Sequence, residues 1–108
     1  MDLWQELEDK RKQLIEAVKA LDRFGRKYAE AERDYKILLR QEALKLKDQG
    51  MAATLITLVV YGIQDVAMAR CKRDVAEATY KTAQELINAV KLEMRILESQ
   101  MDREWRNE

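Results

Sequence analysis

The acidic side chains at helical spacing are the residues of this chain best suited to chemistry. Glu6 with Asp9, and Asp74 with Glu77, stand three residues apart, a spacing that puts both carboxylates on one face of a helix. Paired carboxylates can hold Mg²⁺, so one interpretation is a magnesium-dependent nucleotide hydrolase. Such pairs arise by chance in a chain with 20 acidic residues, and these two fall far apart along the predicted fold. This is the least favoured of three interpretations.

The chain has no histidine and a single cysteine, Cys71. Ser–His and Cys–His nucleophiles, histidine bases, histidine metal ligands and the usual di-iron bundle are therefore excluded. Glycine-rich phosphate-binding loops are also absent. Cys71 stands beside Lys72 and Arg73, and without a histidine base we interpret it as a small residue on a helix flank. We predict no enzymatic activity, no catalytic residue, no metal and no cofactor.

Two long segments carry the seven-residue repeat of packed helices. Leucines and tyrosines recur every seven residues from Leu7 to Tyr35, and a second series runs from Arg73 to Met101. Smaller apolar residues lie three positions after most members of each series, which is typical of a coiled-coil seam. Proline is absent, and 37% of the residues are charged. The sequence predicts one all-α domain over residues 1–108, a long antiparallel helical hairpin with a short connecting helix.

Glycines and capping residues predict where the helices begin and end. The first helix is expected over about 2–49, because Gly50 is a typical C-terminal signal. Thr54 is expected to cap a connector helix over about 54–61, and Gly62 to end it before a helix over about 64–106. Gly25 either allows a neighbouring helix to approach closely or marks a kink; the unbroken seven-residue register favours close approach.

The hairpin register predicts one polar layer. If the chain turns near residues 57–58, Glu42 faces Arg73 and Tyr35 faces Tyr80. A lone pair of opposite charges in an apolar seam fixes alignment, and we favour this structural role over a binding site in the bundle.

The apolar residues extend beyond a narrow seam. The run from Met51 to Ile63 is too short to span a membrane and is expected to be buried, and further large apolar residues flank both seams. If these residues were exposed to solvent, they would form a larger apolar patch than soluble monomers usually show. We therefore predict a twofold dimer forming a four-helix bundle. The candidate oligomer or partner contacts are Trp4, Trp105, Leu55, Leu58, Val59 and Tyr61.

Charge is balanced over the chain, with 20 basic and 20 acidic residues, but it is unevenly distributed. Residues 36–81 contain eight basic and five acidic side chains. This mild excess supports a second interpretation, an accessory protein in nucleic-acid processing whose binding weakens with salt. Its candidate contacts are Arg40, Lys45, Lys47, Arg70 and Lys72. The charged N-terminus does not resemble a signal peptide, and a cytoplasmic location is expected.

The chain contains several short motifs. They are Tyr28-Ala-Glu-Ala-Glu-Arg-Asp-Tyr35, Gly50 with Thr54-Leu-Ile56 and Gly62, Val66-Ala67, Asp74-Val-Ala-Glu-Ala78 with Tyr80, and Lys91-Leu-Glu-Met-Arg-Ile-Leu-Glu98 with Gln100 and Arg103-Glu-Trp105. These motifs resemble a group of small helical proteins encoded by phages and prophages of Gram-positive bacteria. The group has no assigned activity, so the resemblance transfers no site residue. It implies a phage or prophage origin and the host cytoplasm as location. The favoured interpretation is a non-enzymatic oligomeric interaction or scaffold protein, with a phage or host protein as a further partner.

Overall fold

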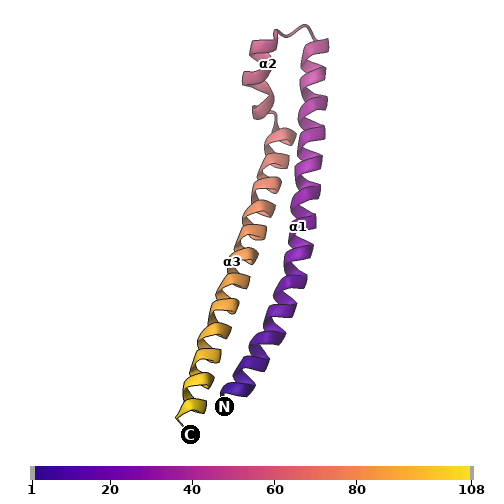
Figure 1. The fold of residues 1–108 in the computed structure, drawn as a ribbon. Helices are drawn as coiled ribbons and strands as arrows, with labels where there is room; N and C mark the ends of the chain where they lie inside the picture. The colour runs from indigo at the N-terminus through magenta and orange to yellow at the C-terminus, as the bar shows by residue number, and fades with distance from the viewer. Residues whose placement is uncertain (1, 108) are drawn as a thin grey trace. The chain divides into compact units, whose positions relative to one another are not determined.

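The computed structural model describes residues 2–107, and these residues contain helices and turns but no strand. The helices follow in the order α1 (Leu3–Asp48), α2 (Ala53–Val59), the 3₁₀ helix η1 (Val60–Gly62) and α3 (Gln64–Arg106). Figure 1 labels the three α-helices. The predicted all-α class is confirmed.

The chain divides into two compact units. Unit 1 comprises Met1–Phe24 and Tyr80–Glu108, and unit 2 comprises Gly25–Thr79. In each unit, a segment of α1 runs antiparallel to a segment of α3 (Figure 1). Helix α1 continues without a break through Gly25, the first residue of unit 2.

Unit 1 is held together by the predicted apolar seam. Leu7 of α1 and Ala83, Ile87 and Val90 of α3 are buried, and the charged positions between them are mostly exposed. The start of α1 is capped by Asp2, whose Oδ1 accepts a hydrogen bond from the backbone N–H of Gln5 at 2.7 Å. This cap satisfies one of the free N–H groups at the start of the helix.

Unit 2 buries residues from three elements. Its core contains Ala31 and Tyr35 of α1, Val60 of η1 and Val66 of α3. Val66 is completely inaccessible to solvent. The connector therefore contributes to the core mainly through one residue, Val60.

The end of α1 is a glycine-dependent turn. Gly50 has φ +88°; its N–H donates to the carbonyl of Lys47 at 2.9 Å, and the N–H of Met51 donates to the carbonyl of Leu46 at 3.1 Å. This pair of bonds is the Schellman motif, which needs a left-handed residue that only glycine adopts at little cost. The prediction that Gly50 ends the first helix is confirmed.

The predicted cap of the connector helix is wrong. Helix α2 begins at Ala53, and its N-cap residue is Ala52, which makes no side-chain hydrogen bond to the helix. Thr54 lies inside the first turn, where its hydroxyl is past the capping position. A different threonine, Thr57, donates its hydroxyl to the carbonyl of Ala53 at 3.2 Å.

The predicted helix register is also wrong, because the chain reverses earlier than expected. The reversal lies in the turn between Asp48 and Ala53, so α2 already belongs to the returning arm (Figure 1). In unit 2, Arg73 therefore meets Glu32, ten residues before the expected Glu42. In unit 1, Glu93 pairs with Lys10, where a turn near residues 57–58 would have brought Asp22. Both contacts show a shift of about three helical turns.

Candidate interaction surface

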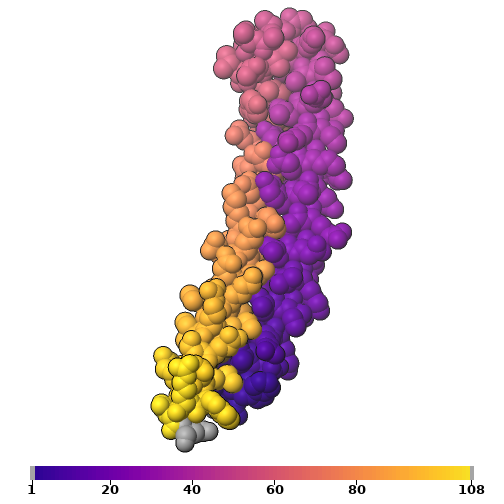
Figure 2. Space-filling model, viewed as in Figure 1, coloured from indigo at the N-terminus to yellow at the C-terminus, as the bar shows by residue number. Residues whose placement is uncertain are grey.

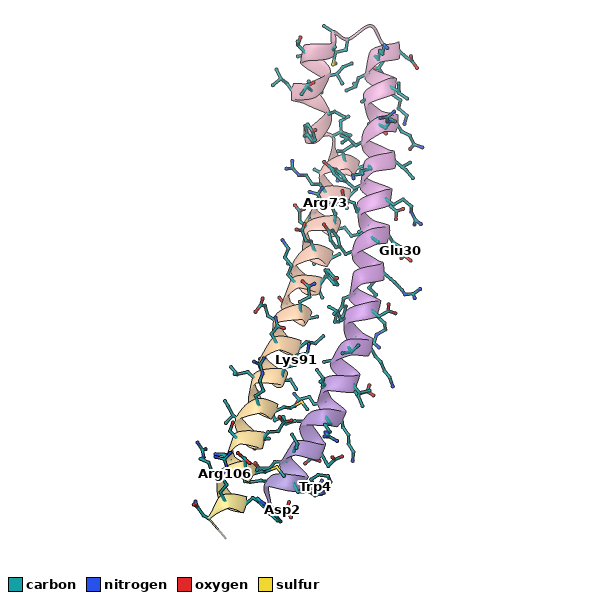
Figure 3. All side chains as sticks on the ribbon, viewed as in Figure 1. Asp2, Trp4, Glu30, Arg73, Lys91 and Arg106 are labelled. Carbon is teal, nitrogen blue, oxygen red and sulfur yellow. The ribbon has the colours of Figure 1, made fainter. Side chains whose placement is uncertain are left out.

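Arg73 is the centre of the main polar cluster in unit 2. Its guanidinium lies over the ring of Tyr35, 4.7 Å from the ring centroid. Its Nε lies 3.7 Å from Oε2 of Glu32, and its Nε and one terminal nitrogen donate to Oδ1 of Asp74 at 2.9 and 2.8 Å. The hydrogen bond to Asp74 is the main reason that the pKa of Arg73 rises above its ordinary value; burial opposes the rise, and the charges of Asp74 and Glu32 add smaller increases. Figure 3 labels Arg73 on α3.

Glu42 does not belong to this polar cluster. Its carboxylate pairs with Lys45, one turn further along α1, at 3.1 Å. The predicted layer of Glu42 and Arg73 is therefore corrected to one of Glu32, Tyr35 and Arg73, because the earlier chain reversal changes the partner of Arg73. Each residue of this layer contacts another residue of the layer, and Arg73 also pairs with Asp74. These contacts within the fold are consistent with a structural role.

In each acidic pair that suggested magnesium chemistry, at least one carboxylate is engaged by a neighbouring polar group. Asp9 accepts a hydrogen bond from the side-chain amide of Gln5 at 3.0 Å, and Asp74 is held by Arg73. Glu6 and Asp9 line a 420 Å³ cavity of unit 1 together with Glu93, but Glu93 pairs with Lys10 there. Among residues 2–107, no three acidic, cysteine or histidine side chains are grouped so as to hold a metal ion.

The connector exposes most of its apolar side chains. Leu58 is 78% exposed, and Leu55, Val59 and Tyr61 are exposed as well. Val60 is only 4% exposed, and Ile56 and Ile63 are half-buried. Burial of the whole run from Met51 to Ile63 is therefore wrong for the single chain: one side of the connector packs in unit 2 and the other meets solvent. Figure 2 shows the connector side chains gathered beside the end of α1.

A second exposed apolar set lies on one side of the helix pair in unit 2. Ile37 and Leu44 of α1 are seven residues apart, as are Met68 and Val75 of α3, and all four are exposed. Ile37 and Val75 each lie two positions after a seam residue, Tyr35 or Arg73, and in an antiparallel pair these equivalent positions share one side. We call these four residues and the exposed connector residues Leu55, Leu58, Val59 and Tyr61 the apolar surface of unit 2. Sequence reasoning missed Met68, although its spacing to Val75 was available.

A groove of about 580 Å³ separates the end of α1 from α2 and η1. Apolar or small side chains make up most of its lining, and cations from α1 stand along it. Its lining residues are Lys36, Leu39, Arg40, Ala43, Leu44, Lys47, Ala53, Ile56, Thr57, Val60 and Tyr61. The groove was not predicted, because it depends on how the connector folds back along α1.

The candidate nucleic-acid contacts all fall in unit 2 and all are exposed. They are Arg40, Lys45, Lys47, Arg70 and Lys72. Unit 2 contains ten basic and eight acidic residues, whereas unit 1 contains ten and twelve. Two of the candidates have close neighbours: Lys45 pairs with Glu42, and Arg70 lies 5.6 Å from the ring centroid of Tyr61.

Both tryptophans of unit 1 are exposed. Trp4 is 57% exposed and Trp105 is 77% exposed, and Figure 3 labels Trp4 near the start of α1. Neither indole is buried in the core of unit 1. Cys71 is also exposed, with a free thiol.

Within residues 2–107, no single helix is long and apolar enough to cross a bilayer. The segments Ala53–Gly62 and Gln64–Arg106 pass that test only as a pair bent by 65°, and only by length and composition. Comparison with protein-family models, with curated proteins and with solved structures gave no match to this chain.

Proposed function

We propose that this protein is a non-enzymatic helical module that self-associates through the apolar surface of unit 2. The observation that carries the proposal is the exposure of α2, a seven-residue helix without a charged or buried residue. The uncharged stretch extends from Gln49 to Gln64. A helix whose only polar side chains are two threonines is expected to be largely covered, and Leu58 at its outward side has no cover.

The size of this surface supports a dimer. Its eight large side chains are between 37% and 78% exposed, which leaves roughly 700 Å² of side-chain area to cover, close to the ~800 Å² that each partner buries in a standard protein interface. At about 25 cal/mol per Å², covering it on two copies offers roughly 35 kcal/mol before the costs of association. A twofold pairing uses the same surface on both copies, and two helix pairs brought together in this way form a four-helix bundle.

Sedimentation velocity at micromolar concentration tests the proposal. The wild-type protein is expected to sediment as a dimer, and Leu58→Glu as a monomer, because the substitution puts a charge at the most exposed position of α2. Ile15→Glu is the matched control, since Ile15 is an equally apolar exposed residue in unit 1, and it should remain dimeric. A wild-type monomer would refute the proposal.

A second candidate function is nucleic-acid binding by the basic residues of unit 2. It is supported by the five exposed cations of that unit and by its small positive balance. Phosphate contacts would give binding that falls steeply with salt. A gel-shift assay with single- and double-stranded DNA and RNA at low and moderate salt tests it, and the absence of a shift at low salt eliminates it.

The resemblance to phage and prophage proteins supports a setting for either function. In such a setting the protein acts in the cytoplasm of the host bacterium, with a phage or host protein as a further partner. A pull-down from infected or lysogenic cells checks this part of the proposal, and recovery of no phage or host protein above background would count against it.

A further inference from the structure

The groove beside α2 combines an apolar floor with charged side chains that are all positive. Leu39 and Ala43 of α1 and Ile56 and Val60 of the connector provide apolar lining. Three lining residues are basic and none is acidic: Lys36, Arg40 and Lys47. Lys36 pairs with Glu32 at 3.3 Å, whereas Arg40 and Lys47 have no ion-pair partner within residues 2–107. The groove therefore presents two uncompensated positive charges next to apolar surface.

The dimensions of the groove suit a short helix. Its lining on α1 extends from Lys36 to Lys47, which corresponds to roughly 16 Å, or about three helical turns. Ala43 and Ala53 are small lining residues on its two walls, and small residues allow the backbone of a partner helix to come close. An amphipathic helix places apolar side chains at positions i, i+3, i+4 and i+7 into such a groove.

The lining favours a polypeptide over a nucleic acid. Nucleic-acid grooves combine cations with aromatic rings on which bases stack. Tyr61 is the one aromatic residue that lines this groove, and its ring is already in contact with the guanidinium of Arg70. Aliphatic side chains make up the rest of the floor, and these match the apolar face of a helix.

From these features we infer that the groove of unit 2 binds an acidic amphipathic helix of a partner protein. The apolar side chains of that helix lie on Leu39, Ala43 and Ile56, which are half-buried residues of the groove lining. Its carboxylates lie near Arg40 and Lys47, where charge complementarity sets both the orientation and the rate of association. This inference concerns the groove, which shares Leu44 and Tyr61 with the apolar surface of unit 2 but does not include Leu58.

Fluorescence anisotropy with two designed peptides tests the inference. The probe is a fluorescein-labelled 14-residue helix with leucine at i, i+3, i+4 and i+7 and glutamate at the outward positions; the comparison peptide carries lysine instead of glutamate. We expect the acidic peptide to bind at least tenfold more tightly than the basic one, and its affinity to fall with salt.

Matched variants separate the groove from general charge effects. Arg40→Glu/Lys47→Glu is expected to weaken binding of the acidic peptide about tenfold or more, since it turns two attractive charges into repulsive ones. Lys12→Glu/Arg23→Glu makes the same charge change in unit 1 and should leave binding within twofold. Ala43→Phe fills the groove and should also weaken binding about tenfold, with the helical circular dichroism unchanged.

Several outcomes would overturn the inference. One is equal binding of the acidic and basic peptides; another is unchanged affinity of a folded Ala43→Phe protein. A third is a single-stranded oligonucleotide that binds more tightly than the acidic peptide and is insensitive to Ala43→Phe, which would assign these cations to nucleic acid. Measuring the Leu58→Glu variant in parallel distinguishes the two proposals. If this variant loses the dimer but still binds the acidic peptide, self-association depends on Leu58 and peptide binding does not.

Discussion

Replacing Arg73 by Met tests the corrected register of unit 2 directly. The substitution keeps a long flexible side chain and removes the charge that contacts Tyr35 and Glu32. Tyr35 is 5% exposed and Arg73 is 20% exposed, so the cation–π contact is largely desolvated and contributes about 1 kcal/mol. The ion pair with Glu32, whose side chain is 29% exposed, contributes about 0.5 kcal/mol. We expect Arg73→Met to lower the free energy of unfolding by about 1.5 kcal/mol.

Double-mutant cycles assign this loss to individual partners. Arg73→Met combined with Tyr35→Leu should give a coupling energy of about 1 kcal/mol, and Arg73→Met with Glu32→Gln about 0.5 kcal/mol. Glu42→Gln is the matched control, and its coupling to Arg73 should be about zero, within ~0.3 kcal/mol, because Glu42 pairs with Lys45. Tyr35→Phe keeps the ring and should retain most of the coupling.

Urea unfolding followed by circular dichroism at 222 nm provides these energies. All variants must be measured at one protein concentration, because self-association links stability to concentration. A coupling of Arg73 to Glu42 that exceeds its coupling to both Glu32 and Tyr35 would refute the register described for unit 2. Such a result would instead support a chain reversal in the middle of the connector, near residues 57–58.

Three further predictions concern the turn, the core and the thiol. Gly50→Ala should cost about 1–2 kcal/mol in urea unfolding, because φ +88° is strained for any residue with a Cβ; Gly62→Ala meets open space and should stay within about 0.5 kcal/mol, and equal effects would contradict the turn geometry. Val66→Ala should cost about 1.5–3 kcal/mol, since Val66 is fully buried, while the half-exposed Val18→Ala should change stability by less than about 0.5 kcal/mol; a neutral Val66→Ala would contradict the core. Cys71 is exposed and should react with one equivalent of Ellman's reagent without denaturant, whereas no reaction before unfolding would show that it is covered.

The seam could be predicted from the sequence because burial imposes its own period. Leu7, Tyr35 and Ile87 fall on the expected seven-residue series, and each is buried. Ala31 and Val90 lie three positions after a member of a series and are buried as well. Apolar residues recur at the helical period on the face that contacts the partner helix. This periodicity does not depend on which residue of the partner each side chain contacts.

The register could not be predicted, because the connector gives no periodic signal. Every side chain of α2 is uncharged, so its sequence does not show which side faces α1 or to which arm the helix belongs. The Schellman bond from Met51 to Leu46 completes the stop of α1, and the chain turns back at once. A reversal in the middle of the connector, as the sequence predicts, would pair Arg73 with Glu42 instead of Glu32. The groove was missed for the same reason, since it exists only where α2 returns along α1.

The buried side of the connector contributes to folding, and we expect its exposed side to contribute only to association. Val60 is buried in unit 2, whereas Leu58, two residues earlier, is the most exposed large apolar residue of the described chain. A charge at Val60 would have to be buried without a partner, at a cost that unit 2 can hardly withstand. A charge at Leu58 enters water and costs the single chain almost nothing. Since folding does not require leucine at this position, its exposed side chain is best explained by contact with a second surface. Leu58→Glu should therefore abolish association while unfolding in urea at the same midpoint as a dilute, monomeric wild-type protein.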